Sequence, residues 1–370
     1  MPTRAHGSGE KGFLVVAGGA LREQEAAVLS SFVRLAGPRG RLAVLPTASA
    51  EPGRSASGAA EALRTHGAAS DVLVLELSAG DAERADESDF TSQLARLDGV
   101  WISGGSQSRI TAALRPEGRQ TAGLRALREL LARGGVVGGS SAGAAVMSEV
   151  MITGGRSADA LVHGVARGSD ERGMGLAPGL GLFPWGITDQ HFLARGRLGR
   201  LVVALQAARL ERGWGVDEDG AFLADLSTAT VTAIGPCSLA LVDLSPADIS
   251  APGVRGARLA LLGSGDRVHG PSGRVLPRPG RRALDPGRQP GFTARSRPRQ
   301  DLSAPLEPWG RDGLLHLLEH LASDPTQPAV ARGDGCELAL SADERTRFLV
   351  GPDEDAGPCA VDVLLAVRAL

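Results

Sequence analysis

The first 150 residues alternate short apolar runs with helical stretches, and this alternation is the strongest constraint on the fold. Between the runs, residues 21–35 and 121–132 carry apolar side chains at helical spacing, and Gly134 is placed to end the second helix. The pattern predicts an α/β domain with a mostly parallel sheet and helices on both of its faces. The apolar runs begin at Phe13, Arg41, Asp71, Gly99 and Gly135.

Glycine and serine are concentrated where the predicted strands end. Pairs of glycines stand at positions 18–19, 104–105 and 138–139. Ligands bind at the carboxyl ends of the strands in sheets of this kind. We therefore expect the functional site at this edge of the sheet.

Length and composition are those of an ordinary globular protein. The 370 residues exceed the usual size of one domain, so we expect one large domain and an appendage. No run reaches the roughly 18 apolar residues that a membrane span requires, and the short run 13–17 is no signal-peptide core. Three cysteines without CxxC spacing predict neither a disulfide framework nor a zinc-thiolate site. We expect a cytoplasmic protein without a membrane partner.

The second half of the chain divides by composition. Alternating short strands are expected over residues 215–262, as hairpins that complete the first domain. Residues 263–300 hold nine arginines against two aspartates, and no aromatic ladder interleaves them. We interpret this stretch as a solvated linker and not as a nucleic-acid surface. A helix over residues 311–322 and two apolar strands then predict a small C-terminal α/β unit.

These observations predict four segments. Residues 1–11 are a tail, residues 12–275 one large domain, residues 276–301 a Pro/Gly/Arg-rich linker, and residues 302–370 a small C-terminal extension of unknown role.

The strongest local motif is a GxSxG sequence over residues 139–143, at the end of a predicted strand and the start of a helical run. In a nucleophile elbow, glycines two before and two after the serine let the backbones pass without Cβ clashes. The serine oxygen is then exposed beside backbone N–H groups that stabilise an oxyanion. In a chain with 51 glycines the pattern alone is weak, and Ser141 needs partners.

Among seven histidines, His191 is the best candidate for a base. It follows an apolar segment, which places it at a strand end on the same rim as Ser141. For the acid, the sequence Gly215-Val216-Asp217-Glu218-Asp219-Gly220 offers carboxylates at the end of a short strand, with Asp217 and Glu218 both eligible. We expect serine, base and acid to converge at the carboxyl end of one parallel sheet.

Four segments together resemble the cyanophycinase family of serine peptidases, which also includes aspartyl dipeptidase. The resemblance spans residues 12–275 and implies a three-layer αβα sandwich like that of class I glutamine amidotransferases. It implies Ser141 as nucleophile, His191 as base and Glu218 as acid, in an order that differs from the serine, acid, histidine order of α/β-hydrolases. The segments are GGSSAGAAVMS from Gly138, SGGSQSRI from Ser103, DQHFLARGRLGRL from Asp189 and GVDEDGA from Gly215.

The resemblance also implies the remaining site residues. Gly105 and Ala142 would donate the oxyanion-hole N–H groups. The implied substrate is cyanophycin or another β-aspartyl peptide, whose carboxylates and guanidinium groups suit a pocket of arginines and carboxylates. Ser106 departs from the family, where an acidic residue commonly follows the two glycines. The implied substrate-binding residues are Gln107, Asp189, Gln190, Arg195, Arg197 and Arg200.

A competing motif over residues 316–320 has the HxxEH spacing of inverted zinc peptidases. It lies in a leucine-rich helix outside the catalytic domain, so we expect no metal and no cofactor.

The sequence leaves three candidate functions. The first is an exopeptidase that releases β-Asp-Arg dipeptides from cyanophycin through an acyl-enzyme. The second is an isoaspartyl or aspartyl dipeptidase, and the third is a binding relative without turnover. The sequence is compatible with a homodimer and does not determine the oligomeric state.

Overall fold

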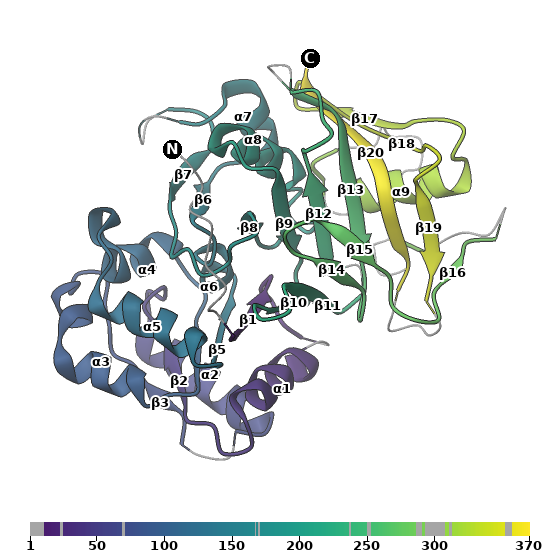
Figure 1. Cartoon of the computed structure of the whole chain (residues 1–370). Coiled ribbons are helices and arrows are strands. Elements are labelled where there is room, and N and C mark those ends of the chain that lie inside the picture. Colours follow the sequence, from purple (N-terminus) through teal and green to yellow (C-terminus); the bar gives the residue numbers. More distant parts are fainter. Residues whose placement is uncertain are drawn as a thin grey trace.

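The computed structural model describes most of the chain. The described residues are 11–22, 25–68, 71–166, 168, 171–236, 238–249, 253–285, 291–292, 308–310, 313–351 and 357–370. Two nine-stranded sheets dominate it. Figure 1 shows the first sheet with the early helices at one end of the molecule, and the second sheet with the C-terminal strands at the other.

All five strands predicted in the first 150 residues form, and they are parallel neighbours in the first sheet. Their order is β3-β2-β4-β5-β1, after which antiparallel β10, β11, β14 and β15 complete the sheet. The strand bounds are β1 Phe13–Ala17, β2 Leu42–Leu45, β3 Leu73–Val74, β4 Gly99–Ile102, β5 Val136–Ser140, β10 Ala221–Asp225, β11 Thr230–Ile234, β14 Arg267–His269 and β15 Arg274–Leu276.

Helices cover both faces of this sheet, because side chains alternate along each strand. Val15 and Ala17 of β1 pack with α1 (Glu25–Ala36) and α2 (Pro52–Thr65), while Leu14 and Val16 pack with helices on the other face. A mixed α/β fold around a parallel core is confirmed. The other-face helices are α3 Ser88–Ala95, α4 Gln107–Leu114 and α5 Ala122–Ala132, with short 3-10 turns at Glu83–Asp86 and Pro116–Gly118.

The second sheet has the order β16-β19-β20-β13-β12-β9-β8, with the β17–β18 hairpin paired to β20. Only β8 and β9 are parallel neighbours in it. The bounds are β8 Ile187–Asp189, β9 Arg212–Val216, β12 Leu239–Asp243, β13 Gly253–Leu262, β16 Arg282–Ala283, β17 Ala329–Gly333, β18 Cys336–Ser341, β19 Arg347–Val350 and β20 Cys359–Ala369.

Side chains on one face of the second sheet share a core with the first sheet, and those on the other face pack on α7 (Ser157–His163), α8 (Leu198–Ala208) and α9 (Gly313–Ser323). The described part of the C-terminal extension has four strands where the sequence predicted two, and β20 lies directly beside β13 of the preceding large domain. A two-stranded sheet, β6 (Val150–Gly154) with β7 (Gly175–Pro178), connects the halves.

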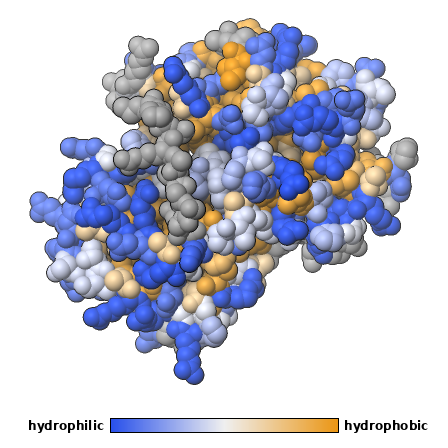
Figure 2. All heavy atoms as spheres, viewed as in Figure 1, coloured by the Kyte–Doolittle hydropathy of each residue, from blue (hydrophilic) through white to orange (hydrophobic). Residues whose placement is uncertain are grey.

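Within the part of the chain that the structure describes, no helix has both the length and the apolar character to cross a membrane. The longest apolar helices pack on the sheets, and Figure 2 shows hydrophilic side chains over most of the visible face, with smaller apolar patches between them.

Residues 276–285, which lie in the predicted linker, differ from a solvated chain. They include β16, which pairs with β19. The Arg281 guanidinium donates two 2.6 Å hydrogen bonds to the Asp266 carboxylate, and both side chains are at most 1% exposed. Composition alone predicted that Arg281 is solvated, because composition does not show which arginine lies beside a buried aspartate. Of the remaining residues of the predicted linker, the structure describes Gly291 and Phe292, and Phe292 is buried.

Replacing Arg281 with alanine should leave the Asp266 carboxylate buried without its cation. Losing one partner of such a pair costs about 3 to 5 kcal/mol, so the free energy of unfolding in urea should fall by that amount. The neighbouring Arg282→Ala removes an exposed guanidinium and should change the same quantity by less than about 0.5 kcal/mol. Equal effects of the two substitutions would contradict the assignment.

Candidate active site

Ser141 occupies a strained turn between β5 and the short helix α6 (Ala142–Ala145). Its φ of 54° and ψ of −107° are unusual for a residue with a side chain. The flanking glycines are required sterically. A Cβ on Gly139 would lie 2.6 Å from the Gly143 carbonyl, and a Cβ on Gly143 would lie 2.3 Å from the Ile102 carbonyl oxygen. The motif therefore has the geometry of a nucleophile elbow.

A chain of two hydrogen bonds joins the three predicted residues. Ser141 Oγ lies 2.9 Å from His191 Nε2, and His191 Nδ1 lies 2.8 Å from Glu218 Oε1. The side chain of His191 is 9% exposed and that of Glu218 24%. Serine and base are thus within the reach that proton transfer requires, and the acid orients the far side of the imidazole ring.

The expectation that one parallel sheet supplies all three residues is wrong. Ser141 follows β5 of the first sheet, whereas His191 and Glu218 each follow a strand of the second sheet by two residues, after β8 and β9. Since β8 and β9 are parallel neighbours, their carboxyl ends deliver histidine and acid together. The site therefore forms where the edges of two sheets meet.

The end of β1 holds this junction together. The carbonyl oxygen of Ala17 accepts the Ser141 N–H at 3.0 Å, and that of Gly18 accepts the His191 N–H at 3.0 Å. A Cβ on Gly19, whose φ is +108°, would lie 2.5 Å from His191 Cε1. The sequence analysis assigned no contact to Gly18 and Gly19. The sequence feature that could have indicated one is the glycine pair directly after the strand that begins at Phe13.

Asp217, the alternative acid, has a different contact. Its carboxylate accepts the Ala194 N–H at 2.9 Å, and therefore supports the loop that carries His191. Burial raises the pKa of Asp217 to about 6, against the lowering effect of its backbone hydrogen bonds. In this structure the carboxylate bonded to His191 is that of Glu218.

The backbone N–H groups of Gly105 and Ala142, near Ser141, have no acceptor within the described chain. A Cβ on Gly104 would lie 3.5 Å from Ser141 Cβ, so the 104–105 turn borders the nucleophile. Gly105 has a φ of +142°, and a Cβ there would lie 2.2 Å from the Ala48 carbonyl oxygen. Both N–H groups are therefore available to an oxyanion.

Burial lowers the pKa of His191 below the ordinary histidine value, and the hydrogen bond that His191 donates to Glu218 opposes that shift. The imidazole is consequently neutral near pH 7, the state in which Nε2 accepts the Ser141 proton. The arrangement suits acyl transfer through serine.

The six residues expected to bind substrate lie in different environments. Gln107, at the start of α4, donates from its amide to the carbonyl oxygens of Ile152 and Thr153 at 2.9 and 3.2 Å. Gln190 is 6% exposed, and its side-chain oxygen is buried without a hydrogen-bond partner. An unpaired buried acceptor is costly, so this oxygen suits a donor from a bound molecule.

Two of the six residues are occupied with each other. Arg200 donates to both carboxylate oxygens of Asp189, at 2.8 and 2.5 Å, and to the Gly155 carbonyl oxygen at 2.9 Å. The side chains are 4% and 1% exposed. This pair does not fit the expectation of direct substrate contact, because both carboxylate oxygens of Asp189 and all three guanidinium nitrogens of Arg200 already have partners within the protein.

The remaining arginines differ in exposure. Arg197 donates to the Gln190 carbonyl oxygen at 2.6 Å, and burial lowers its pKa to about 10. Arg195 is 54% exposed, with Nε 3.9 Å from Glu218 Oε1. Of these three arginines, Arg195 is therefore the one whose guanidinium is most accessible from solvent.

Comparison with known proteins agrees with this geometry. The family model described as peptidase family S51 matches residues 13–232. The cyanophycinase of Synechococcus elongatus is 33% identical over 273 residues, which cover 70% of this chain and 79% of that protein. The cyanophycinase of Trichormus variabilis is 31% identical over 275 residues, covering 71% and 87%.

Among solved structures, a peptidase from an acI-B1 Actinobacterium has a TM-score of 0.44 at 18% identity, covering 64% of this chain and 92% of its own. Because the family match extends over more than half of the chain, the protein belongs to peptidase family S51, a family of serine peptidases.

Proposed function

We propose that this peptidase hydrolyses cyanophycin, multi-L-arginyl-poly-L-aspartate, and releases β-Asp-Arg dipeptides through an acyl-enzyme at Ser141. The observation that carries the chemistry is the hydrogen-bond chain from Ser141 through His191 to Glu218, beside two unpaired N–H groups. The substrate is proposed because both relatives above are cyanophycinases. The parallel sheet between two helical layers fits the sandwich of class I glutamine amidotransferases, which we propose as the fold type.

In the first step, Ser141 Oγ attacks the carbonyl carbon of the main-chain bond between two aspartates, while His191 Nε2 takes the hydroxyl proton. The N–H groups of Gly105 and Ala142 bind the oxyanion. The bond to the leaving amine then breaks, and the amine receives the proton from His191. A water molecule repeats the sequence on the ester and frees Ser141, with Glu218 stabilising the imidazolium each time.

For substrate recognition we assign direct contacts to Arg195, Gln190 and Gln107, which border the site. An exposed guanidinium suits a substrate carboxylate, and the unpaired Gln190 oxygen suits a guanidinium or ammonium donor. Asp189 and Arg200 we propose as positioning residues, because their ion pair ties the end of β8 to α8. Arg197 holds the Gln190 main chain in the same way.

The alternatives are an aspartyl or isoaspartyl dipeptidase and a binding relative without turnover. Incubating the purified protein with insoluble cyanophycin, and identifying the soluble products by mass, separates all three. Release of β-Asp-Arg is expected, and turnover of Asp-X dipeptides without release from the polymer would establish the dipeptidase. Failure to turn over either substrate, or any ester, would favour the binding relative.

Replacing Arg195 with lysine should lower kcat/KM on cyanophycin roughly tenfold, because a point charge replaces a bidentate donor at a half-exposed position. Hydrolysis of an uncharged ester, which uses only the serine, histidine and oxyanion donors, should survive. Arg96→Lys is the matched control. This exposed residue precedes β4, and therefore lies near the amino ends of the parallel strands, away from Ser141. Equal loss on both substrates would show that Arg195 acts through Glu218 and not on the substrate.

A further inference from the structure

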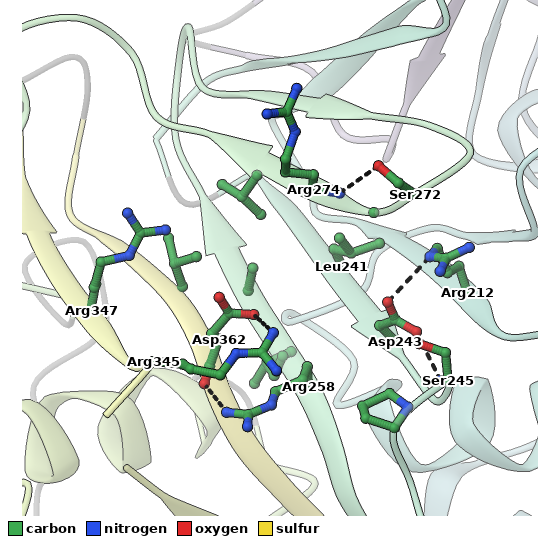
Figure 3. Close-up of a pocket in the computed structure, with 16 residues that line it drawn as sticks. Arg212, Leu241, Asp243, Ser245, Arg258, Ser272, Arg274, Arg345, Arg347 and Asp362 are labelled. Carbon is green, nitrogen blue, oxygen red and sulfur yellow. Dashed lines mark hydrogen bonds and ion pairs between the residues drawn. The ribbon is translucent and has the colours of Figure 1, made fainter. Parts of the chain in front are cut away.

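A cavity away from Ser141 lies between the second sheet and the hairpin of β14 and β15, and its volume is about 340 Å³. Strand β9 begins there at Arg212 and ends beside Glu218, so the cavity and the catalytic site lie at opposite ends of one strand. No residue assigned to the catalytic site lines the cavity. Figure 3 shows its lining.

The floor of the cavity is apolar. Leu241, Ala260 and Val361 line it, and each is less than 5% exposed as part of the core between the two sheets. Leu241 and Ala260 are directly paired across β12 and β13. The cavity is therefore a place where this core opens to solvent, and it offers contact to a short hydrocarbon segment.

Arginines form the walls, and three of the five are neutralised by aspartates. Arg212 Nε lies 3.2 Å from Asp243, Arg258 makes a two-point contact with Asp343 at 2.6 and 3.0 Å, and Arg345 lies 3.6 Å from Asp362. These three pairs need no ligand.

Arg274 and Arg347 are different. Neither guanidinium has a carboxylate within 4 Å or a hydrogen-bond acceptor among the described residues. Figure 3 labels them on separate strands at separate points of the rim, with the dashed line at Arg274 coming from its main-chain N–H to Ser272. The cavity thus carries two uncompensated positive charges with an apolar floor between its walls.

The C-terminal extension is required for this arrangement. Arg345, Arg347, Val361 and Asp362 all lie beyond residue 302, outside the segment that matches the family. Arg274 lies on the β15 strand of the first sheet, and Arg347 lies on β19 of the extension. The cavity is therefore assembled by the extension against the domain that carries catalysis.

We propose that this cavity binds a small organic dianion with two carboxylates on a short aliphatic chain. Arg274 and Arg347 each take one carboxylate through paired N–H donors, and the apolar floor contacts the chain between them. The volume is near the lower end of that of ligand pockets and suits a small molecule. Two separated guanidinium groups favour a molecule with separated charges over a compact phosphate.

The test uses the full chain and succinate as the probe, with binding followed by calorimetry and by the rise in unfolding temperature. Acetate and inorganic phosphate are compared at the same ionic strength. Arg274→Gln combined with Arg347→Gln should weaken succinate binding by about 10- to 100-fold, because two charge-assisted contacts are lost. Each single substitution should produce part of the loss.

Arg267→Gln combined with Arg282→Gln is the matched control. These exposed arginines lie on β14 and β16, the neighbours of β15 and β19, and their removal changes the net charge equally. The control should bind succinate within about twofold of the wild type. The proposal is overturned if the control loses as much affinity as the pocket variant, if the pocket variant loses none, if acetate binds as tightly as succinate, or if phosphate binds and succinate does not. Because the readout is binding, these outcomes are independent of the proposed reaction.

Discussion

Ser141→Ala is expected to lower kcat on any substrate by roughly 10⁴- to 10⁶-fold, because the residues of a serine triad act as a unit. The backbone should be unaffected. Alanine retains the Cβ that already tolerates a φ of 54°, and the Ser141 N–H still bonds to the Ala17 carbonyl oxygen. Stopped-flow or extended incubation assays measure the loss, and the unfolding midpoint in urea checks that the fold persists.

Ser140→Ala is the matched control for this experiment. Ser140 is the adjacent residue and ends β5 opposite Ala17, and the hydrogen bond to His191 Nε2 comes from Ser141 Oγ. Its loss should change kcat by only a few-fold. A fluorophosphonate should modify Ser141 in the wild type and in Ser140→Ala, and leave Ser141→Ala unmodified. Modification of Ser140, or retained activity without Ser141, would remove the serine from its assigned role.

The parts of the fold that were predictable are those with a local signal. Strands β1 and β4 are buried apolar runs followed by glycine pairs, and the elbow follows from the spacing of Gly139, Ser141 and Gly143. The strand pairing of the second sheet has no local signal of this kind. Its β8 is three residues long, β9 contains two glycines, and β13 pairs with β20 more than 90 residues later. Pairing over that distance cannot be read from local periodicity.

Side-chain partners were the least predictable feature. Arg195 and Arg200 are indistinguishable in composition, yet one is 54% exposed and the other is buried against Asp189, because α8 turns only the second toward the sheet. Likewise Asp217 and Glu218 are adjacent acids on opposite sides of the chain. One reaches the Ala194 N–H and the other reaches His191. The choice between them rested on family resemblance until the geometry was known.

That choice leads to the second large effect, the replacement of Glu218 with glutamine. If the glutamine amide donates to His191 Nδ1, the ring proton lies on Nε2. Protonated Nε2 can no longer accept the Ser141 proton. A glutamine oxygen that accepts from Nδ1 lacks the charge that stabilises the imidazolium. Either arrangement should lower kcat, by up to about four orders of magnitude when the tautomer is wrong.

The pH dependence of this variant has a definite sign. In the wild type, burial lowers the pKa of His191, so kcat/KM should stay high at neutral pH and fall as the pH decreases through a value below the ordinary histidine pKa. The hydrogen bond that His191 donates to the Glu218 carboxylate raises that pKa. Without the carboxylate, His191 should lose its proton at a lower pH, and the remaining activity of Glu218→Gln should show its inflection below that of the wild type.

Asp217→Asn makes the same chemical change one residue away and completes the comparison. An asparagine oxygen still accepts the Ala194 N–H, and burial has already raised the pKa of this carboxyl group to about 6. Its loss of negative charge should therefore cost less than about tenfold in kcat and leave the inflection near that of the wild type. Profiles of kcat/KM against pH for the three proteins decide the matter. A larger loss in Asp217→Asn than in Glu218→Gln, or an inflection that moves upward in Glu218→Gln, would show that the acid acting on His191 is not Glu218.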